Sequence, residues 1–237
     1  MLINKNLNVT VDNDCEFELF MGNHTIERTS TYHYLGIMLD DKLSWSHHIS
    51  EVCIKLSQVA GIFYKVRSLL SKDAMMLLYH GLAGSKLRYG LICWATASKS
   101  LLNKVNVSHN KIVTYMTFSK RCSRMWPLYC QIKVLPLQIL IQIEYGKTMY
   151  KLLHNQLPEA FDCYFNKPRH HHNTRFSTTN MNFERSHISS SVDTSLLKNI
   201  GPKIWAKIPL VIKEALSLKV FIKSLRNHLI GNLSGLD

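Results

Sequence analysis

The chain has 237 residues, 46% of them hydrophobic, and a formal net charge of +13. This length and composition suffice for a buried core, which argues against disorder. No apolar run reaches the roughly 20 residues that cross a bilayer, and the N-terminal residues lack the apolar core of a signal peptide. We therefore expect a soluble, intracellular protein, cytoplasmic or nuclear, with no membrane partner.

The positive charge is unevenly distributed along the chain. Residues 1–50 hold three Lys or Arg against seven Asp or Glu, whereas the rest holds 26 against nine, a balance of +17. A surplus of this sign attracts polyanions, and nucleic acid is the commonest polyanion in a cell. Basic residues that only keep helix faces solvated would give the same net charge. Charge alone therefore leaves open whether these residues bind nucleic acid or only face solvent.

The first 45 residues have the period of β-strands. Apolar and polar residues alternate over residues 7–11 and 15–21. Gly22-Asn23 is a suitable hairpin turn before a third extended stretch over residues 32–39. This pattern predicts a small antiparallel sheet.

From residue 46 the apolar period becomes that of a helix. Apolar residues recur every three or four positions from Ile49 to Leu70, behind an N-cap candidate at Ser46. Three more helices are predicted, from Ser71 to about Arg88, from Ser98 to about Phe118 and from Pro136 to His154. The four helices should pack as a bundle.

Polar residues dominate between Asn166 and Ser195, which predicts a long loop. The apolar period returns near Gly201 and ends in a helix from Ser217. The predicted fold is therefore α+β, mainly α, with three regions: a small β-sheet over 1–45, a helical bundle over 46–157, and a polar loop with a C-terminal helical extension over 158–237.

Asp40-Asp41 is the pair most suggestive of catalysis, because adjacent aspartates between apolar strands hold two divalent metals in nucleic-acid polymerases. Such a site also needs a carboxylate from a neighbouring strand, and the upstream carboxylates lie on a short, self-contained sheet. We interpret the pair as a turn leading to Ser44-Trp45, where Asp bonds to the nearby backbone. We predict no catalytic residue and no metal ligand.

The histidines and cysteines lack the spacing of metal or redox motifs. His47-His48 and His170-His171-His172 are adjacent in sequence, so their rings point in different directions, and we predict surface histidines. The triple run could instead contact phosphate together with Arg169 and Arg175. The six cysteines form no C-x2-C pair and are predicted to be reduced and mostly buried.

Basic side chains beside aromatic ones are the best candidates for nucleic-acid contact. No nucleophile elbow or phosphate-cradling Gly-rich loop occurs. Lys120 and its basic neighbours adjoin Tyr115, Phe118 and Trp126, which could stack a base, although Trp126 is favoured as a core residue. The candidate nucleic-acid-binding residues are Lys55, Lys65, Arg67, Lys120, Arg121, Arg124, Arg169 and Arg175.

Several short motifs follow one another in a familiar order. They are Tyr34-Leu35-Gly36-Ile37-Met38-Leu39-Asp40, Leu43-Ser44-Trp45, Leu87-Arg88-Tyr89-Gly90, Cys93-Trp94, His172-Asn173-Thr174-Arg175 and Gly201-Pro202-Lys203-Ile204-Trp205. Over about 200 residues of this chain, the series resembles the region after the catalytic palm in reverse transcriptases of non-LTR (long interspersed class) retrotransposons.

The resemblance implies that the Tyr-Leu-Gly strand belongs to a primer grip and that the helices form a thumb and a C-terminal extension. The palm, with its Mg²⁺-binding aspartates, would lie upstream of such a region. We therefore expect a truncated reverse-transcriptase fragment that binds template-primer nucleic acid, either RNA or an RNA/DNA duplex. It would hold no cofactor and no polymerase site of its own.

Whether the chain acts as an RNA-directed DNA polymerase stays open, and we expect it to be inactive alone. A separately encoded palm domain is a candidate partner, and a non-functional relic or a protein-interaction scaffold is the alternative function. A missing palm should leave an apolar face exposed on the N-terminal sheet, at Phe17, Leu19, Tyr34 and Ile37.

Overall fold

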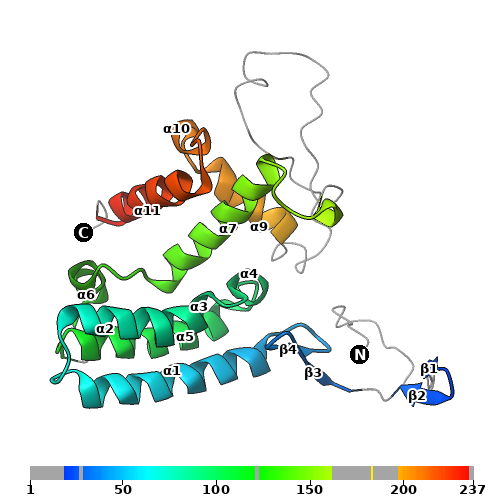
Figure 1. Cartoon of the computed structure of the whole chain (residues 1–237), viewed down its shortest axis with the longest axis horizontal. Helices are drawn as coiled ribbons and strands as arrows, with labels where there is room; N and C mark the ends of the chain where they lie inside the picture. Colours follow the sequence, from blue (N-terminus) through cyan, green and yellow to red (C-terminus); the bar gives the residue numbers. More distant parts are fainter. Residues whose placement is uncertain (1–18, 27–28, 121–122, 162–182, 184–196, 235–237) are drawn as a thin grey trace.

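The computed structural model describes residues 19–26, 29–120, 123–161, 183 and 197–234, and this part is mainly helical with two short hairpins at its N-terminal end (Figure 1). The predicted α+β, mainly α class is confirmed. No helix among these residues is long and apolar enough to cross a membrane. The strands are β1 (Leu19–Met21), β2 (His24–Ile26), β3 (Thr31–Tyr34) and β4 (Ile37–Asp40).

The strands form two antiparallel hairpins in separate two-stranded sheets. β1 pairs with β2 across Gly22-Asn23, as predicted. β3 pairs with β4, so the third predicted stretch is two strands rather than one. Leu35 (φ 47°) and Gly36 (φ 76°) turn the chain between them, and the left-handed backbone at Gly36 is one that glycine adopts at little cost. The predicted strand over 7–11 lies outside the described residues, as does most of 15–21.

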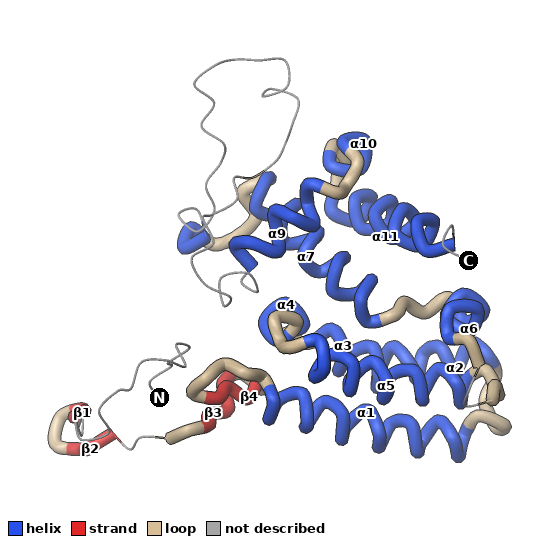
Figure 2. Tube along the Cα trace, turned by 180° about the vertical axis from the view of Figure 1, so that it is seen from behind, coloured by secondary structure: helices blue, strands red, loops and turns tan. Residues whose placement is uncertain are grey.

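Helix α1 (Ser46–Val66) has one buried stripe and packs against α5 (Lys99–Met116), beside which it lies in Figure 2. The prediction of Ser46 as its N-cap is wrong. Trp45 occupies that position with φ 65°, and no side chain caps the helix there. Ser98 does cap α5, because its side chain accepts from the backbone N–H of Leu101.

The second predicted helix is one continuous helical segment in three parts. These are α2 (Lys72–Leu78), the π-helix η1 (Tyr79–Gly84) and α3 (Ser85–Arg88). Ser71 caps it as predicted, with its hydroxyl accepting from the backbone N–H of Ala74 at 3.3 Å. Two short helices between the second and fourth predicted helices were not predicted, namely α4 (Leu91–Trp94) and α6 (Met125–Ile132).

Helix α7 (Leu137–Leu153) lies between two groups of helices (Figure 1). It packs mainly against α9 (Leu197–Ala206) and α11 (Leu218–Ser234), and it also contacts α4 and α5. A Cβ on Gly146 would lie 2.7 Å from a methyl group of Leu225, so glycine permits the close approach of α7 and α11. The remaining short elements are η2 (Glu159–Phe161) and α10 (Leu210–Lys213).

One core cluster of buried side chains runs through both groups of helices, from Trp94 and Tyr145 to Trp205 and Phe221. The phenol of Tyr150 donates to the backbone oxygen of Ala215 at 2.6 Å, tying α7 to the segment before α11. The domain limits drawn from the sequence stay a prediction.

The apolar face predicted on the N-terminal strands is only partly exposed. Tyr34 is 59% exposed, as expected, whereas Ile37 is half-buried and packs against the core. Phe17 and the side chain of Leu19 lie outside what is described. Other apolar side chains of the two hairpins are exposed: Phe20, Met21, Tyr32 and Leu35.

Three cysteines fall within the described residues, and all three are free thiols. Cys53 is half-buried, but Cys93 and Cys130 are exposed, so the prediction of mostly buried thiols is wrong for these two. They lie in α4 and α6, the two short helices that the sequence pattern did not identify.

Candidate nucleic-acid interface

Both oxygens of the Asp40 carboxylate are engaged by the backbone that follows it. Oδ1 accepts from the N–H of Ser44 at 2.8 Å and Oδ2 from the N–H of Trp45 at 2.9 Å, and Asp40 is buried. Asp41 donates its own N–H to the backbone oxygen of Ser30. This geometry confirms the interpretation of the two aspartates as a turn before α1.

Metal binding finds no support at Asp40, because its oxygens face backbone donors rather than an open site. Within the described segments, no three His, Cys, Asp or Glu side chains lie together as metal ligands. The Asp40 carboxylate therefore does not fit a two-metal centre, which needs carboxylate oxygens free to bind the ions.

A pocket of about 340 Å³ lies between the β3–β4 turn, α1 and α3. We call it the anion pocket, and it is lined by Gly36, His48, Val52, Lys55, Ser85, Lys86 and Tyr89. Among these residues are two lysines and a histidine but no carboxylate. The pocket thus gathers positive charge from two helices.

His48 supplies the only buried polar side chain of the anion pocket lining. Its Nδ1 accepts from the backbone N–H of Met38 at 3.3 Å, so in the neutral ring the proton sits on Nε2. Burial lowers the pKa of His48, which keeps the ring neutral at pH 7. Nε2 is buried and makes no hydrogen bond within the described residues.

The other polar groups of the anion pocket differ in what they can offer. The hydroxyl of Ser85 donates to the backbone oxygen of Gly81, and the phenol of Tyr89 donates to the backbone oxygen of Leu35. Neither proton is therefore free for a ligand. The donors that remain at the pocket are the two lysine ammonium groups, which suit an anion.

Lys55 already has a carboxylate partner beside the pocket. Its Nζ lies 3.3 Å from Oε2 of Glu51, whose Oε1 lies 3.3 Å from Nε2 of His33. The Lys55 side chain is 47% exposed, so this pair is a weak, solvent-screened one. An anion in the pocket can therefore compete with Glu51 for Lys55.

A second basic feature, the Arg67 cluster, lies where α1 and α5 end. The guanidinium carbon of Arg67 lies 4.8 Å from the ring centre of Tyr64, 5.0 Å from that of Phe118 and 5.9 Å from that of Tyr115. Tyr64 and Phe118 are both more than half exposed. The cluster thus combines a held cation with accessible aromatic faces, on which bases can stack.

The structure distributes the predicted binding residues over different surfaces. Lys55 lines the anion pocket. Arg67 meets Tyr115 and Phe118, two of the three aromatic residues that were predicted to lie beside Lys120, Arg121 and Arg124. Trp126, favoured as a core residue, is half-buried at the edge of the core. Lys65, Lys120 and Arg124 are exposed, whereas Arg121, Arg169 and Arg175 lie outside the described residues.

Sequence reasoning missed His48, Ser85 and Lys86. His48 was expected at the surface and is 4% exposed, so that prediction is wrong, whereas His47 is exposed as expected. His48 and Lys55 are seven residues apart in one helix and therefore share a face, which is a signal that the sequence did contain.

Comparison with known proteins gives limited but consistent similarities. No family model matches the chain, and no solved structure matches it significantly. It is 26% identical over 104 residues to the probable RNA-directed DNA polymerase from transposon X-element of Drosophila melanogaster, and 34% identical over 89 residues to the RNA-directed DNA polymerase from mobile element jockey of the same organism.

The matched stretches cover 43% and 36% of this chain and only 12% and 10% of those two relatives. The chain thus spans about a tenth of the length of the curated relatives that it matches. Over about two fifths of its length, it is similar to RNA-directed DNA polymerases of mobile elements.

Proposed function

We propose that this chain is a nucleic-acid-binding part of a non-LTR retrotransposon reverse transcriptase, corresponding to the thumb and C-terminal extension after the palm. Its role is to hold template-primer duplex, and polymerisation requires a palm that these helices do not supply. The similarity to two RNA-directed DNA polymerases and the surplus of basic residues support the proposal.

The anion pocket is the observation that carries the proposal. A phosphate of the duplex backbone would lie against the ammonium groups of Lys55 and Lys86. The two lysines contribute the charge that such a contact needs. Contacts of this type position a duplex without reading its sequence.

The test is the binding of an RNA/DNA hybrid duplex of about 20 base pairs, followed by fluorescence anisotropy over a range of salt concentrations. Log affinity should fall steeply with log salt. The double variant Lys55→Gln/Lys86→Gln should reduce that slope by about 1 to 2 units, since each phosphate contact contributes about one unit.

The matched control is Lys99→Gln/Lys219→Gln, which removes two charges from exposed lysines that do not line the anion pocket. It should leave the slope close to that of the unchanged protein. A flat salt dependence for the unchanged protein, or equal effects of the two double variants, would refute the proposed function.

The exposed apolar residues of the two hairpins favour a second role in protein contact. Phe20, Met21 and Leu35 are each more than 60% exposed, and exposed apolar patches mark interaction sites. A separately encoded palm domain is the partner that we propose for these two hairpins. Co-purification of a palm with the unchanged chain, but not with a Met21→Lys/Leu35→Lys variant, would support it.

A further inference from the structure

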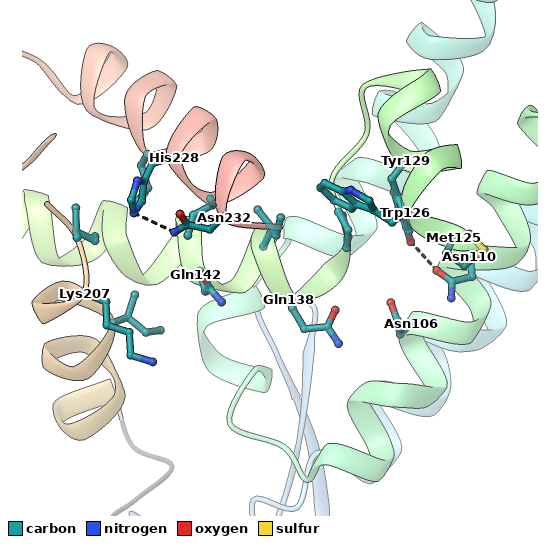
Figure 3. A pocket seen from close by; sticks show the side chains of 16 residues that line it. Asn106, Asn110, Met125, Trp126, Tyr129, Gln138, Gln142, Lys207, His228 and Asn232 are labelled. Carbon is teal, nitrogen blue, oxygen red and sulfur yellow. Dashed lines mark hydrogen bonds between the residues drawn. The ribbon is translucent and has the colours of Figure 1, made fainter. Parts of the chain in front are cut away.

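A second, larger pocket of about 700 Å³ lies between α5, α6, α7, α9 and α11 (Figure 3). We call it the amide pocket, because five of its polar residues are Asn or Gln. Its lining is Asn106, Asn110, Met125, Trp126, Tyr129, Pro136, Gln138, Ile139, Gln142, Ile204, Lys207, Ile208, Leu225, His228, Leu229 and Asn232. This lining contains no Asp or Glu, and Lys207 is its one Lys or Arg.

Six polar side chains enter the amide pocket as three pairs with a spacing of four residues. They are Asn106 and Asn110 on α5, Gln138 and Gln142 on α7, and His228 and Asn232 on α11. Because residues four apart share a helix face, each helix presents two polar groups to the same space. The pairing is a property of the fold, since it combines three helices that are distant in sequence.

Three of the carboxamides are open to a ligand. The side chains of Asn106, Gln138 and Gln142 make no hydrogen bond within the described part of the chain, and Figure 3 shows them in a row that ends at Lys207. Each carboxamide has both a donor and an acceptor. A ligand that matches them must itself carry donors and acceptors along one edge.

Asn110 is held in one orientation by buried groups behind it. The phenol of Tyr129 donates to Asn110 Oδ1 at 2.7 Å, and the same phenol oxygen accepts, at 3.1 Å, from Nδ1–H of the fully buried His109. The Nε2 of His109 accepts in turn from the phenol of Tyr79 at 2.7 Å. This order of protons uses the carbonyl of Asn110 and leaves its NH₂ group, which Figure 3 shows pointing away from Tyr129, without a hydrogen bond in the described part of the chain.

We propose that the amide pocket binds one unpaired nucleotide of a single-stranded nucleic acid, with the base among the carboxamides and a phosphate near Lys207. Asn and Gln side chains match the mixed donor and acceptor edges of bases, and the half-buried Trp126 offers a ring to stack on. The volume is that of a small-ligand site, about 300–1,000 Å³, and is too confined for a duplex. The choice of nucleic acid as the ligand rests on the proposed function, but the site is separate from the anion pocket.

The orientation of Asn110 makes the proposal specific, because the ligand atom opposite its NH₂ group must be an acceptor. Asn110→Asp retains an oxygen for Tyr129 and replaces the donor by an acceptor. Asn103→Asp adds the same charge to the same helix at an exposed position outside the amide pocket, and it is the matched control.

The experiment measures binding of a labelled single-stranded RNA of about ten nucleotides and mixed sequence. It uses the full chain carrying Lys55→Gln/Lys86→Gln, so that the anion pocket makes little contribution. Asn110→Asp should weaken binding about tenfold, the effect of one lost hydrogen bond together with repulsion, and Asn103→Asp less than about twofold. An oligomer of abasic ribose phosphates should bind weakly to the chain that carries only Lys55→Gln/Lys86→Gln. Its affinity should be about that of RNA for the same chain with Asn110→Asp added.

Equal effects of the two aspartate variants, or equal binding of RNA and the abasic oligomer, would overturn the proposal. Binding of an uncharged ten-residue peptide that RNA cannot displace would also overturn it, and would assign the pocket to peptides. If thermal melting shows that the Asn110→Asp variant is unfolded, a Lys207→Gln variant is used instead, since Lys207 is exposed. An RNA affinity that Lys207→Gln leaves unchanged would then overturn the proposal. A failure of the proposed function can be told apart from a failure of this proposal, because the proposed function is tested by duplex binding to the protein that retains Lys55 and Lys86.

Discussion

Replacing His109 with glutamine should make the stability of the protein less sensitive to acid. His109 is fully buried on α5, and its two ring nitrogens contact the hydroxyl groups of Tyr79 and Tyr129. Burial lowers the pKa of His109 from 6.5 to about 3. The folded protein therefore keeps this ring neutral under conditions in which the unfolded chain protonates it.

The sign and size of the effect follow from this difference in pKa. Below pH 6.5 the unfolded state gains a proton at His109 that the folded state does not accept until about pH 3. The stabilisation is therefore complete above pH 6.5 and is lost as the pH falls. One proton corresponds to about 1.4 kcal/mol per pH unit, so about 3 kcal/mol of unfolding free energy should be lost between pH 6.5 and about pH 4.

Urea unfolding at several pH values between about 7 and 4 measures this loss. Other groups also titrate in this range, so the informative quantity is the difference between variants. The His109→Gln variant should be less stable at pH 7, and its disadvantage should shrink by about 3 kcal/mol toward pH 4. His47→Gln, at an exposed position on α1, is the control and should follow the unchanged protein.

Equal pH slopes for the His109→Gln and His47→Gln variants would refute the reasoning. If His109→Gln does not fold, the ring protons of the unchanged protein can be followed by NMR through the same pH range. A His109 resonance that titrates near pH 6.5 would show that burial does not suppress its protonation.

Two further predictions concern the backbone around the second hairpin and the helices that it contacts. Asp40→Ala should lower the free energy of unfolding, measured in urea, by about 2 kcal/mol, because it leaves the N–H groups of Ser44 and Trp45 without their acceptor. The control is Asp73→Ala at an exposed position, and a smaller loss for Asp40→Ala than for this control would contradict the prediction. Gly90→Ala should lower the free energy of unfolding by about 2 to 3 kcal/mol in the same assay, because Gly90 has φ 57° and a Cβ there would lie 2.5 Å from a methyl group of Ile37. An unchanged thermal midpoint would contradict this prediction.

Local rules succeeded where the determining contacts are local. Ser71 and Ser98 were identified as helix caps from sequence, and each hydroxyl accepts from a backbone N–H three residues later. The same rule failed at Ser46. There the chain enters the helix through Trp45 in a left-handed conformation, and the acceptor for its N–H is Asp40, five residues earlier.

The candidate sites could be predicted only in part, because they depend on contacts between distant segments. The helical period placed Lys55 and Arg67 on the polar face of the first predicted helix, but it did not identify the partners of either residue. His48 is buried because the β3–β4 hairpin folds back and directs the N–H of Met38 at its ring. The helical period separates His48, four residues before the buried Val52, from the exposed His47, but it does not reveal the backbone partner of His48.

Helix α7 connects the two groups of helices at the amide pocket. The amide pocket is built from α5 and α6 on one side of α7 and from α9 and α11 on the other. A nucleotide held there would contact both groups of helices at once, so its binding energy would add to the packing of the C-terminal helices on α7. Ligand binding should therefore stabilise the association of α7 with α11, which Gly146 and Leu225 bring into close contact, more than it stabilises the hairpins near the anion pocket.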